Sequence, residues 1–473
     1  MRNFFYLIFH FLHIFKFVLA KKIIIPFKTS HNTEINFIES LLYDQIYATL
    51  EIGTMKQKVY LGLTTDESLF AIESAKINEN NYNCNKSISY KNNRGIYIDI
   101  DKSQKYIYGD ILNETFYFYN NLDPKKDDIK QYNDIMFGYI TKLGRGYTYK
   151  DNGYIDNNKN LISGKIGLQI TIDYSNTCHT SILKSLKNLN LIDNLVWSIN
   201  YTNNEEGNLI LGENPFQYND SYTEEKRKKT ACTTDSDRDF SWTLIFNDIK
   251  MGNQKLNLFR MADYSPQYGL IKGTSQYFEL VKPYFDNLKK CELKEIIFRT
   301  IKYNYYVCDI NINLNSFEPI IFIHTELETK FILDKDDLFM DYNGKKYFLV
   351  LFQKESSSQK WSLGKPFVKK YQLVFDHESR NIFFYEYSPK SERTSTSKIV
   401  LICVCVVLGI GAIVLGIILG KVFLAEKKKK KAKELIDEIN NNDGNFDFEN
   451  NKENENEENN FDNNNNINDK LVI

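Results

Sequence analysis

The stretch that decides the fold is residues 47–57, which read YATLEIGTMKQ. Its β-branched and aromatic residues, followed by a similar run at 59–63, predict two strands joined by a turn. Outward from here the same pattern of short strands returns along the chain, at 116–119, 196–199, 209–211, 242–246, 305–312, 319–324 and 371–375. Helical periodicity is confined to 181–189 and 276–288. The sequence therefore predicts an all-β body with a few short helices over residues 45–388.

The size and charge of the chain limit what this body can be. The sequence has 473 residues, and an all-β body of roughly 340 residues is too large for one sandwich, which favours two lobes. Lys and Arg number 60 against 61 Asp and Glu, for a formal charge of -1. That balance argues against a general nucleic-acid binder, because such proteins carry a basic excess. Apolar residues make up 42% and aromatic residues 14%, which excludes a wholly disordered or collagen-like chain.

The amino terminus has the order of a secretory signal peptide. Arg2 precedes an apolar run over 4–19, and Val18 and Ala20 are small enough for the positions just before a signal-peptidase cut. We therefore predict a cleaved signal peptide over 1–20, with a buried N-terminal helix as the alternative.

A second apolar segment, 399–420, carries no charged residue. At 1.5 Å per residue it is about 33 Å long, enough to cross a bilayer core of roughly 30 Å. Lys421 and the lysines at 427–431 follow it, and such clusters mark the cytoplasmic side. We predict a single-pass type I membrane protein of the secretory pathway, cell surface or endolysosomal or vacuolar membrane, with 21–398 in the lumen or outside. A buried core helix is the alternative.

The residues around this span have distinct roles in the prediction. Residues 390–398 form a juxtamembrane stalk, and 421–473 form a disordered cytoplasmic tail, basic at first and then acidic and rich in asparagine, whose role stays open. Within the span, Ala412, Gly416 and Gly420 recur every four residues, the spacing of a close-packing helix face. Because small residues are common in such spans, homodimerisation through this face stays open.

Five cysteines lie in the predicted ectodomain, where oxidising conditions favour disulfides: Cys84, Cys178, Cys232, Cys291 and Cys308. An odd number leaves one free or in an intermolecular bond. The last two flank a short charged stretch and are the best local pair, whereas the pairing of the other three stays open. Four Asn-x-Ser/Thr sequons predict glycosylation, at Asn85, Asn113, Asn200 and Asn219.

Several segments, taken in order, resemble motifs of the pepsin-like aspartic peptidase family. Residues 47–57 are similar to the family's Tyr-x-x-x-x-Ile-Gly-Thr-Pro-Pro-Gln pattern, and residues 164–168 to its Asp-Gly-Ile-Leu-Gly-Leu stretch. Later segments resemble the strand pair that closes the first lobe, the Asp-Thr-Gly-Thr-Ser turn of the second lobe and the last family motif, at 207–212, 273–275 and 361–376. The resemblance covers essentially the whole body, and its collinear order makes it specific.

This resemblance implies a two-lobed fold with defined boundaries. A short leader, 21–44, would precede an N-terminal lobe over 45–229 and a C-terminal lobe over 230–389, with Cys291 bridged to Cys308 in the second lobe. In the family, two aspartates about 3 Å apart share one proton, so that one activates a water and the other protonates the peptide carbonyl. The resemblance also implies an interlobe cleft that takes extended peptide by strand pairing. It implies neither a metal nor a cofactor.

Neither aspartate stands where the resemblance places it. Counting from residues 47–57 puts the first at Thr64, and counting from 273–275 puts the second at Ile271 or Lys272. Asp66, two residues late, is the fallback candidate. The residues that support the two turns remain, at Thr65, Ser68, Gly167, Gly273, Thr274, Ser275 and Gly364. In the flap, Lys102 stands where the family has a tyrosine, but Tyr106 and Tyr108 are close enough to leave the alignment of this loop open.

This pattern favours a catalytically inactive relative that binds peptide without cutting it. Two alternatives stay open, an active aspartic endopeptidase with an irregular dyad and a structural or adhesion glycoprotein on the same scaffold. Other chemistry has little support, because the histidines lack zinc-ligand spacing and no nucleophile elbow or phosphate-binding loop is present. The expected partners are a peptide or protein ligand and the membrane, with no nucleic acid.

Overall fold

The structure is a computed structural model, and it divides the chain into two compact units, Met1–Ser391 and Glu392–Ile473. The predicted signal peptide and most of the predicted span and tail lie outside the residues that it describes. Those residues are 21–30, 35–42, 46–66, 68–76, 81–89, 91–100, 106–119, 129–143, 162–170, 181–216, 227–232, 234–235, 239–255, 260–298, 301–354, 360–385 and 417–437.

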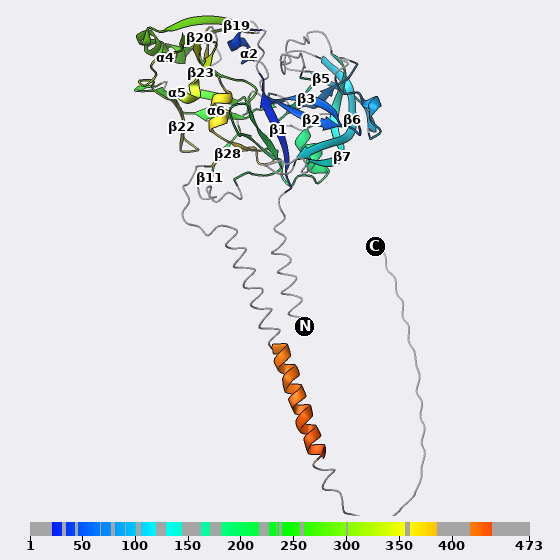
Figure 1. The fold of residues 1–473 in the computed structure, drawn as a ribbon. Coiled ribbons are helices and arrows are strands. Elements are labelled where there is room, and N and C mark those ends of the chain that lie inside the picture. The colour runs from blue at the N-terminus through cyan, green and yellow to red at the C-terminus, as the bar shows by residue number, and fades with distance from the viewer. Residues whose placement is uncertain are drawn as a thin grey trace, which may run out of the picture. The chain divides into compact units, whose positions relative to one another are not determined.

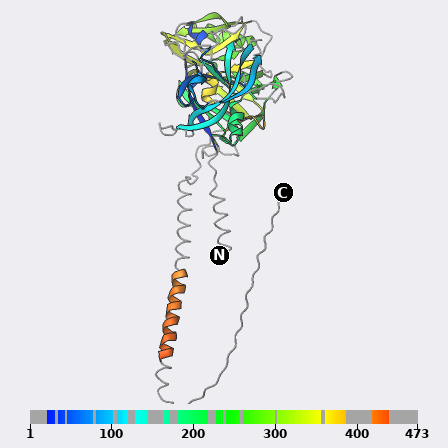
Figure 2. The ribbon, with the colours of Figure 1, turned by 90° about the vertical axis from the view of Figure 1, so that its right-hand side faces the viewer.

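Among the described residues of the first unit, strands predominate and only a few helices interrupt them (Figure 1, Figure 2), which confirms the all-β prediction. In the described part of the chain, thirteen strands form one sheet. Their spatial order is β11 (Arg227–Ala231), β28 (Asn381–Tyr385), β27 (Val374–Asp376), β9 (Val196–Tyr201), β10 (Glu206–Leu211), β1 (Ile23–Thr29), β2 (Ile46–Ile52), β3 (Gln57–Thr64), β8 (Gly164–Gly167), β4 (Phe70–Glu73), β7 (Ile129–Leu143), β6 (Tyr106–Tyr119) and β5 (Lys91–Ile100).

The remaining described strands form smaller sheets. One contains β14 (Thr243–Phe246), β17 (Arg260–Tyr264), β26 (Trp361–Leu363), β18 (Ile271–Gly273), β25 (Val350–Gln353), β20 (Ile301–Asp309), β24 (Lys345–Phe348) and β23 (Phe339–Tyr342), and β19 (Cys291–Phe298) pairs with β20. Another has the order β16 (Gln254–Lys255), β15 (Asp248–Met251), β21 (Ile320–His324) and β22 (Thr329–Leu333). The pair β12 (Thr234–Asp235) and β13 (Asp239–Phe240) stands apart from them.

The same four-strand arrangement occurs twice. In the first, which we call the N-terminal repeat, β3 runs parallel to β8, β8 antiparallel to β4, and β4 parallel to β7. In the second, the C-terminal repeat, β17 runs parallel to β26, β26 antiparallel to β18, and β18 parallel to β25. Chain order and spatial order agree between the two repeats. The fold therefore contains an internal duplication around two strand ends, those of β3 and β17.

The segment 21–44, predicted as a short leader, contributes a central strand instead. β1 lies between β10 and β2 in the thirteen-stranded sheet and pairs antiparallel with both. Ile23, Ile24 and Ile25 are fully buried, because a strand in mid-sheet is covered on both faces. Further along, α2 (Phe37–Ser40) packs its apolar side chains against β20 and β25, with Phe37 stacked on Tyr342. The described residues of this segment, 21–30 and 35–42, are therefore part of the folded body.

The predicted lobe boundaries are also crossed by the sheet. The boundary after residue 229 falls inside β11, and β27 and β28, from the predicted C-terminal lobe, pair with β9 and β11 of the thirteen-stranded sheet. An aromatic cluster formed by residues from both sides of the predicted boundary lies beside these strands. Trp197 stacks on Phe375 with ring centroids 4.1 Å apart, and Trp242 lies edge-on to both. The end of the body is thus packed against its middle.

Both helices that the sequence predicted are present. Residues 181–189 contain α3 (Ile182–Asn188), and residues 276–288 lie in α4 (Ser275–Leu288), which buries Tyr277, Phe278, Val281 and Phe285. Two shorter helices follow, α5 (Lys335–Leu338) and α6 (Lys365–Lys370), and Cys84–Lys86 forms the 3₁₀ turn η1.

The second unit is described only over residues 417–437, which are helical and exposed. Among all the helices described, none is both long and apolar enough to span a bilayer. Of the predicted span, residues 399–416 lie outside the described residues, and 417–420 belong to this helix.

Candidate functional site

The first predicted catalytic position, Thr64, lies at the end of β3. Its Cα is in register with Gly167 of β8, and its backbone oxygen accepts a hydrogen bond from the Leu168 amide at 2.8 Å. The Thr64 hydroxyl accepts a hydrogen bond from the amide of Asp66, which closes a tight turn beyond the strand. The Thr64 side chain is buried, with 5% of its surface exposed. A neutral hydroxyl therefore occupies the end of this strand.

The internal duplication identifies the matching residue in the C-terminal repeat. Tyr264 is in register with Leu363, so Ser265 lies level with Gly364, just as Thr64 lies level with Gly167. A second register gives the same answer. Ala71 pairs with Lys165, two residues before Gly167, and Lys272 pairs with Ser362, two residues before Gly364. Because Ala71 follows Thr64 by seven residues and Lys272 follows Ser265 by seven, both routes equate Thr64 with Ser265.

The structure corrects the second predicted position. Ile271, Lys272 and Gly273 form β18 and do not lie in a strand-ending turn. Thr274 is the N-cap of α4, where its hydroxyl accepts a hydrogen bond from the Tyr277 amide, and Ser275 is the first helical residue. A Gly-Thr-Ser sequence suits a helix N-terminus as well as a turn, because Thr and Ser are favoured caps. The sequence analysis therefore assigned the Gly-Thr-Ser motif to a strand-ending turn, whereas the structure places it at the end of β18 and the start of α4.

Hydrogen bonds join the two strand-ending turns directly. The Thr65 hydroxyl donates to the Tyr264 backbone oxygen at 2.6 Å and lies 3.3 Å from the Gln267 side-chain oxygen. The Ser362 hydroxyl donates to the Ser265 hydroxyl at 2.8 Å. Thr65, Ser265 and Gln267 are all buried. The sequence missed Ser265 and Gln267, and the signal that could have found them is the seven-residue spacing to β18.

Neither position at this junction carries an ionisable group. The nearest acids in sequence are Asp66, whose side chain is exposed, and Asp263, two residues before Ser265. Asp263 already accepts a hydrogen bond from the Thr243 hydroxyl and forms an ion pair with Lys360 at 2.9 Å. Serine and threonine hydroxyls stay neutral at physiological pH. The junction can donate and accept hydrogen bonds, but its described residues include no pair of carboxyls placed to share a proton.

Glycines allow the chain to pass close behind each turn. A Cβ on Gly364 would lie 2.0 Å from the Leu270 oxygen and 2.5 Å from the Tyr268 oxygen, and a Cβ on Gly273 would meet the Trp361 ring at 3.0 Å. Gly167 is buried at the matching place in the N-terminal repeat. Of the other predicted scaffold residues, Thr65 lies at the junction, and Ser68 is half-buried just before β4.

A basic side chain lies beside the second turn. The Lys365 amide donates to the Tyr268 oxygen, and its ammonium lies 3.5 Å from the Thr29 hydroxyl of β1. Burial lowers the pKa of Lys365 to about 8. In the N-terminal repeat the matching residue, directly after Gly167, is the fully buried Leu168. The two repeats therefore differ in charge immediately behind their turns.

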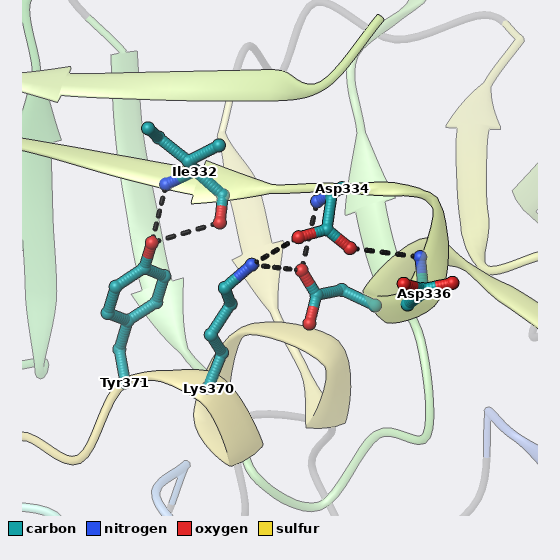
Figure 3. Close-up of polar contacts among 6 residues, drawn as sticks. Ile332, Asp334, Asp336, Lys370 and Tyr371 are labelled. Atoms are coloured by element: carbon teal, nitrogen blue, oxygen red, sulfur yellow. Dashed lines mark hydrogen bonds and ion pairs between the residues drawn. The ribbon is translucent and has the colours of Figure 1, made fainter. Parts of the chain in front are cut away.

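The far end of α6 is tied to α5 and β22 (Figure 3). The Lys370 ammonium donates hydrogen bonds to the carboxylates of Asp334 and Asp337, and its bond to Asp334 lowers the pKa of that carboxyl. The Tyr371 hydroxyl bonds both backbone groups of Ile332, at 2.6 and 2.9 Å. These contacts hold α6 in place. Because Gly364 is the N-cap of α6, they also hold the chain where it passes behind the second turn.

The predicted flap is described only in part. Tyr106 and Tyr108 begin β6, paired with Ile100 and Ile98 of β5, so a hairpin is present here. Lys102 lies in the segment between these strands, outside the described residues.

The remaining predicted sites have mixed outcomes. The disulfide between Cys291 and Cys308 is confirmed, and it joins facing residues of β19 and β20. Cys84 and Cys232 are free thiols, and Cys178 lies outside the described residues. Of the sequons, Asn85 is exposed in η1, whereas Asn113 and Asn200 are half-buried in strands and Asn219 is not described. In the described residues, no group of three or more His, Cys, Asp or Glu is placed to hold a metal ion.

No protein-family model matches the chain, and no curated protein matches it either.

Proposed function

We propose that the chain is a membrane-anchored, pepsin-like, two-lobed protein that binds extended peptide between its lobes without cutting it. The observation that carries this proposal is the pair of hydroxyl residues, Thr64 and Ser265, at equivalent ends of β3 and β17. A pepsin-like enzyme needs an aspartate at each of these places, since one must be ionised while the other is protonated. The duplicated strand arrangement supports the two-lobed reading, and the missing acids support the loss of catalysis.

The contacts between the turns also favour a retained binding frame. Thr65 still links its turn to Tyr264, and Gly364 still lets the chain pass behind Leu270. The hydroxyls of Ser265 and Ser362 form a neutral hydrogen-bonding pair. Such a junction can bond a peptide backbone, which offers uncharged donors and acceptors along an extended strand. Peptide held there would meet no activated water.

The test is to incubate the purified full chain with a diverse peptide library from pH 3 to pH 7. We expect captured peptides to be recovered uncleaved at every pH. Cleavage near pH 4 that is lost in Asp66→Ala or Asp263→Ala would instead support the alternative of an active endopeptidase with an irregular dyad. Recovery of no peptide at all would remove the binding proposal and leave the adhesion alternative.

The proposed anchoring has its own test. In a type I orientation, protease added to intact vesicles should cut the tail, 421–473, only after permeabilisation, because that tail would face the cytoplasm. Glycans should be found only within 21–398, with Asn85 the best exposed of the described sequons. Cutting of the tail in sealed vesicles would contradict the orientation.

A further inference from the structure

The first two described residues are held by specific contacts before β1 begins. The Lys21 backbone nitrogen donates to the Asp193 carboxylate at 2.9 Å, and the Lys21 ammonium donates to the Asn190 oxygen at 3.0 Å. The Lys22 ammonium pairs with Glu213 at 2.8 Å, and the Glu213 side chain is only 5% exposed. Two chain segments, the loop between α3 and β9 and the end of β10, thus contact this short stretch.

The backbone at Gly212 allows Lys21 to approach closely. Gly212 has a φ of +90°, and a Cβ there would lie 2.8 Å from the Lys21 oxygen and 2.5 Å from the Ile192 Cβ. Asn190 also has a positive φ, of 54°, a conformation that Asn tolerates better than most residues. A larger residue at position 212 would push the start of β1 away, so the position of Lys21 is fixed by the fold.

Residues immediately beyond Lys22 cannot be removed without loss of the sheet. Ile23 pairs with Leu211 and Lys28 with Glu206, while Phe27 and Thr29 pair with residues of β2. Three consecutive isoleucines of β1 are fully buried. Loss of a central strand would expose their apolar surface and leave the edges of β10 and β2 unpaired.

We propose that the mature chain begins at Lys21, that its new α-ammonium group binds Asp193, and that β1 is retained for the life of the protein. Hydrolysis of the Ala20–Lys21 peptide bond adds one water, so that Ala20 keeps a carboxyl group and Lys21 gains an amino group, which is protonated at neutral pH. The nitrogen already in contact with Asp193 then changes from a neutral amide donor to a cation. Charge-assisted hydrogen bonds are stronger than neutral ones, so processing strengthens a contact that the fold has already formed.

The processing part is tested on the full chain expressed in a secretory host. Amino-terminal sequencing and intact mass should find Lys21 as the first residue. A chain that keeps residues 1–20, or one that begins beyond Thr29, would overturn the proposal. Neither result depends on peptide binding, so failure of this proposal would leave the proposed function unaffected.

The docking part is tested by labelling the α-amino group at neutral pH with an amine-selective acylating reagent. We expect the group in the wild type to react roughly two- to fivefold more slowly than in Asp193→Asn, the factor that suits an ion pair at the surface. Asp309→Asn is the matched control, because it removes an exposed ion pair with Lys345 instead, and it should label like the wild type. Equal labelling in all three proteins would show that Asp193 does not hold the new terminus.

Discussion

The two repeats share a backbone plan and differ in the side chains placed at their turns. In each repeat a strand ends in a turn, and the residue seven positions after the strand end pairs with the strand that carries a glycine behind the turn. The N-terminal repeat has Thr64 and a buried Leu168, whereas the C-terminal repeat has Ser265 and the cation Lys365. The two repeats therefore share their backbone register, whereas Thr64 and Ser265 place a neutral hydroxyl at each strand end and only the C-terminal repeat has a lysine directly after its glycine.

The largest expected effect comes from restoring an acid to each repeat. In Thr64→Asp with Ser265→Asp, we expect peptide cleavage near pH 4 at least about 100-fold above wild type, since two adjacent carboxyls can again share a proton. The matched control is Thr64→Asp with Ile271→Asp, which places the second acid inside β18 and should stay inactive. Activity in the control, with none in the first pair, would overturn the equivalence of Thr64 and Ser265.

The glycine behind the second turn gives the next largest effect. Gly364→Ala places a Cβ 2.0 Å from a backbone oxygen, and we expect it to lower the free energy of unfolding by about 3 kcal/mol. Gly344→Ala is the control, because it has a positive φ but no atom within 4 Å of the new Cβ, and about 1 kcal/mol is expected. Denaturant unfolding measures both, and equal losses would mean that the close passage behind the turn is not a constraint.

Acid should destabilise the protein through the buried His324 and the half-buried His377, both beyond the N-terminal repeat. Burial lowers the pKa of His324 and of His377 to about 4. The unfolded state therefore binds more protons than the folded state between about pH 6.5 and pH 4, so stability is lost as the pH falls through that range. His377→Gln should flatten this loss by about 2 kcal/mol, as measured by unfolding at pH 7 and pH 4. An unchanged pH dependence would contradict the assignment.

The smallest effect comes from making the repeats alike behind their turns. Lys365→Leu copies Leu168 and should raise the free energy of unfolding at pH 7 by about 1 kcal/mol, since an ammonium is no longer desolvated. The advantage should shrink between about pH 8 and pH 10.5, because in the wild type the folded state releases its proton before the unfolded state does. Lys369→Leu, at an exposed lysine of the same helix, should have little effect. An advantage that does not vary with pH would point to packing alone.

Sequence patterns predicted the elements whose signal is local. The strand 46–52, the helix α4 and the bridge between Cys291 and Cys308 follow from short runs of residues, and each is present as expected. Thr64 was reached by counting a few residues from the neighbouring turn, and it does lie at a strand end. Over such short distances, an error of one residue reverses the faces of a strand and is easily seen.

The features that the sequence did not predict depend on distant pairing. Ile23 to Ile25 lack the alternation of a half-buried strand, because β1 is covered on both faces. They also follow directly after the apolar run of the predicted signal peptide, so the sequence carries no separate strand signal there. Ser265 belongs to no sequence motif. It is identified only by the register of β17 with β26, which places it opposite Gly364, 99 positions later in the sequence. Thr274 and Ser275 carried a turn-like motif but cap a helix.

The position of β1 also sets the order in which the protein can be completed during synthesis. β1 is made first, yet its partner β10 follows some 180 residues later, and β27 and β28 join the same sheet only when residues 374–385 have emerged. A sheet that unites the first and last strands of a body has a high contact order, which slows folding. Until the last strands dock, the edge of β9 and the apolar faces of the early strands are open to aggregation. The thirteen-stranded sheet can therefore be completed only after nearly the whole body has been synthesised.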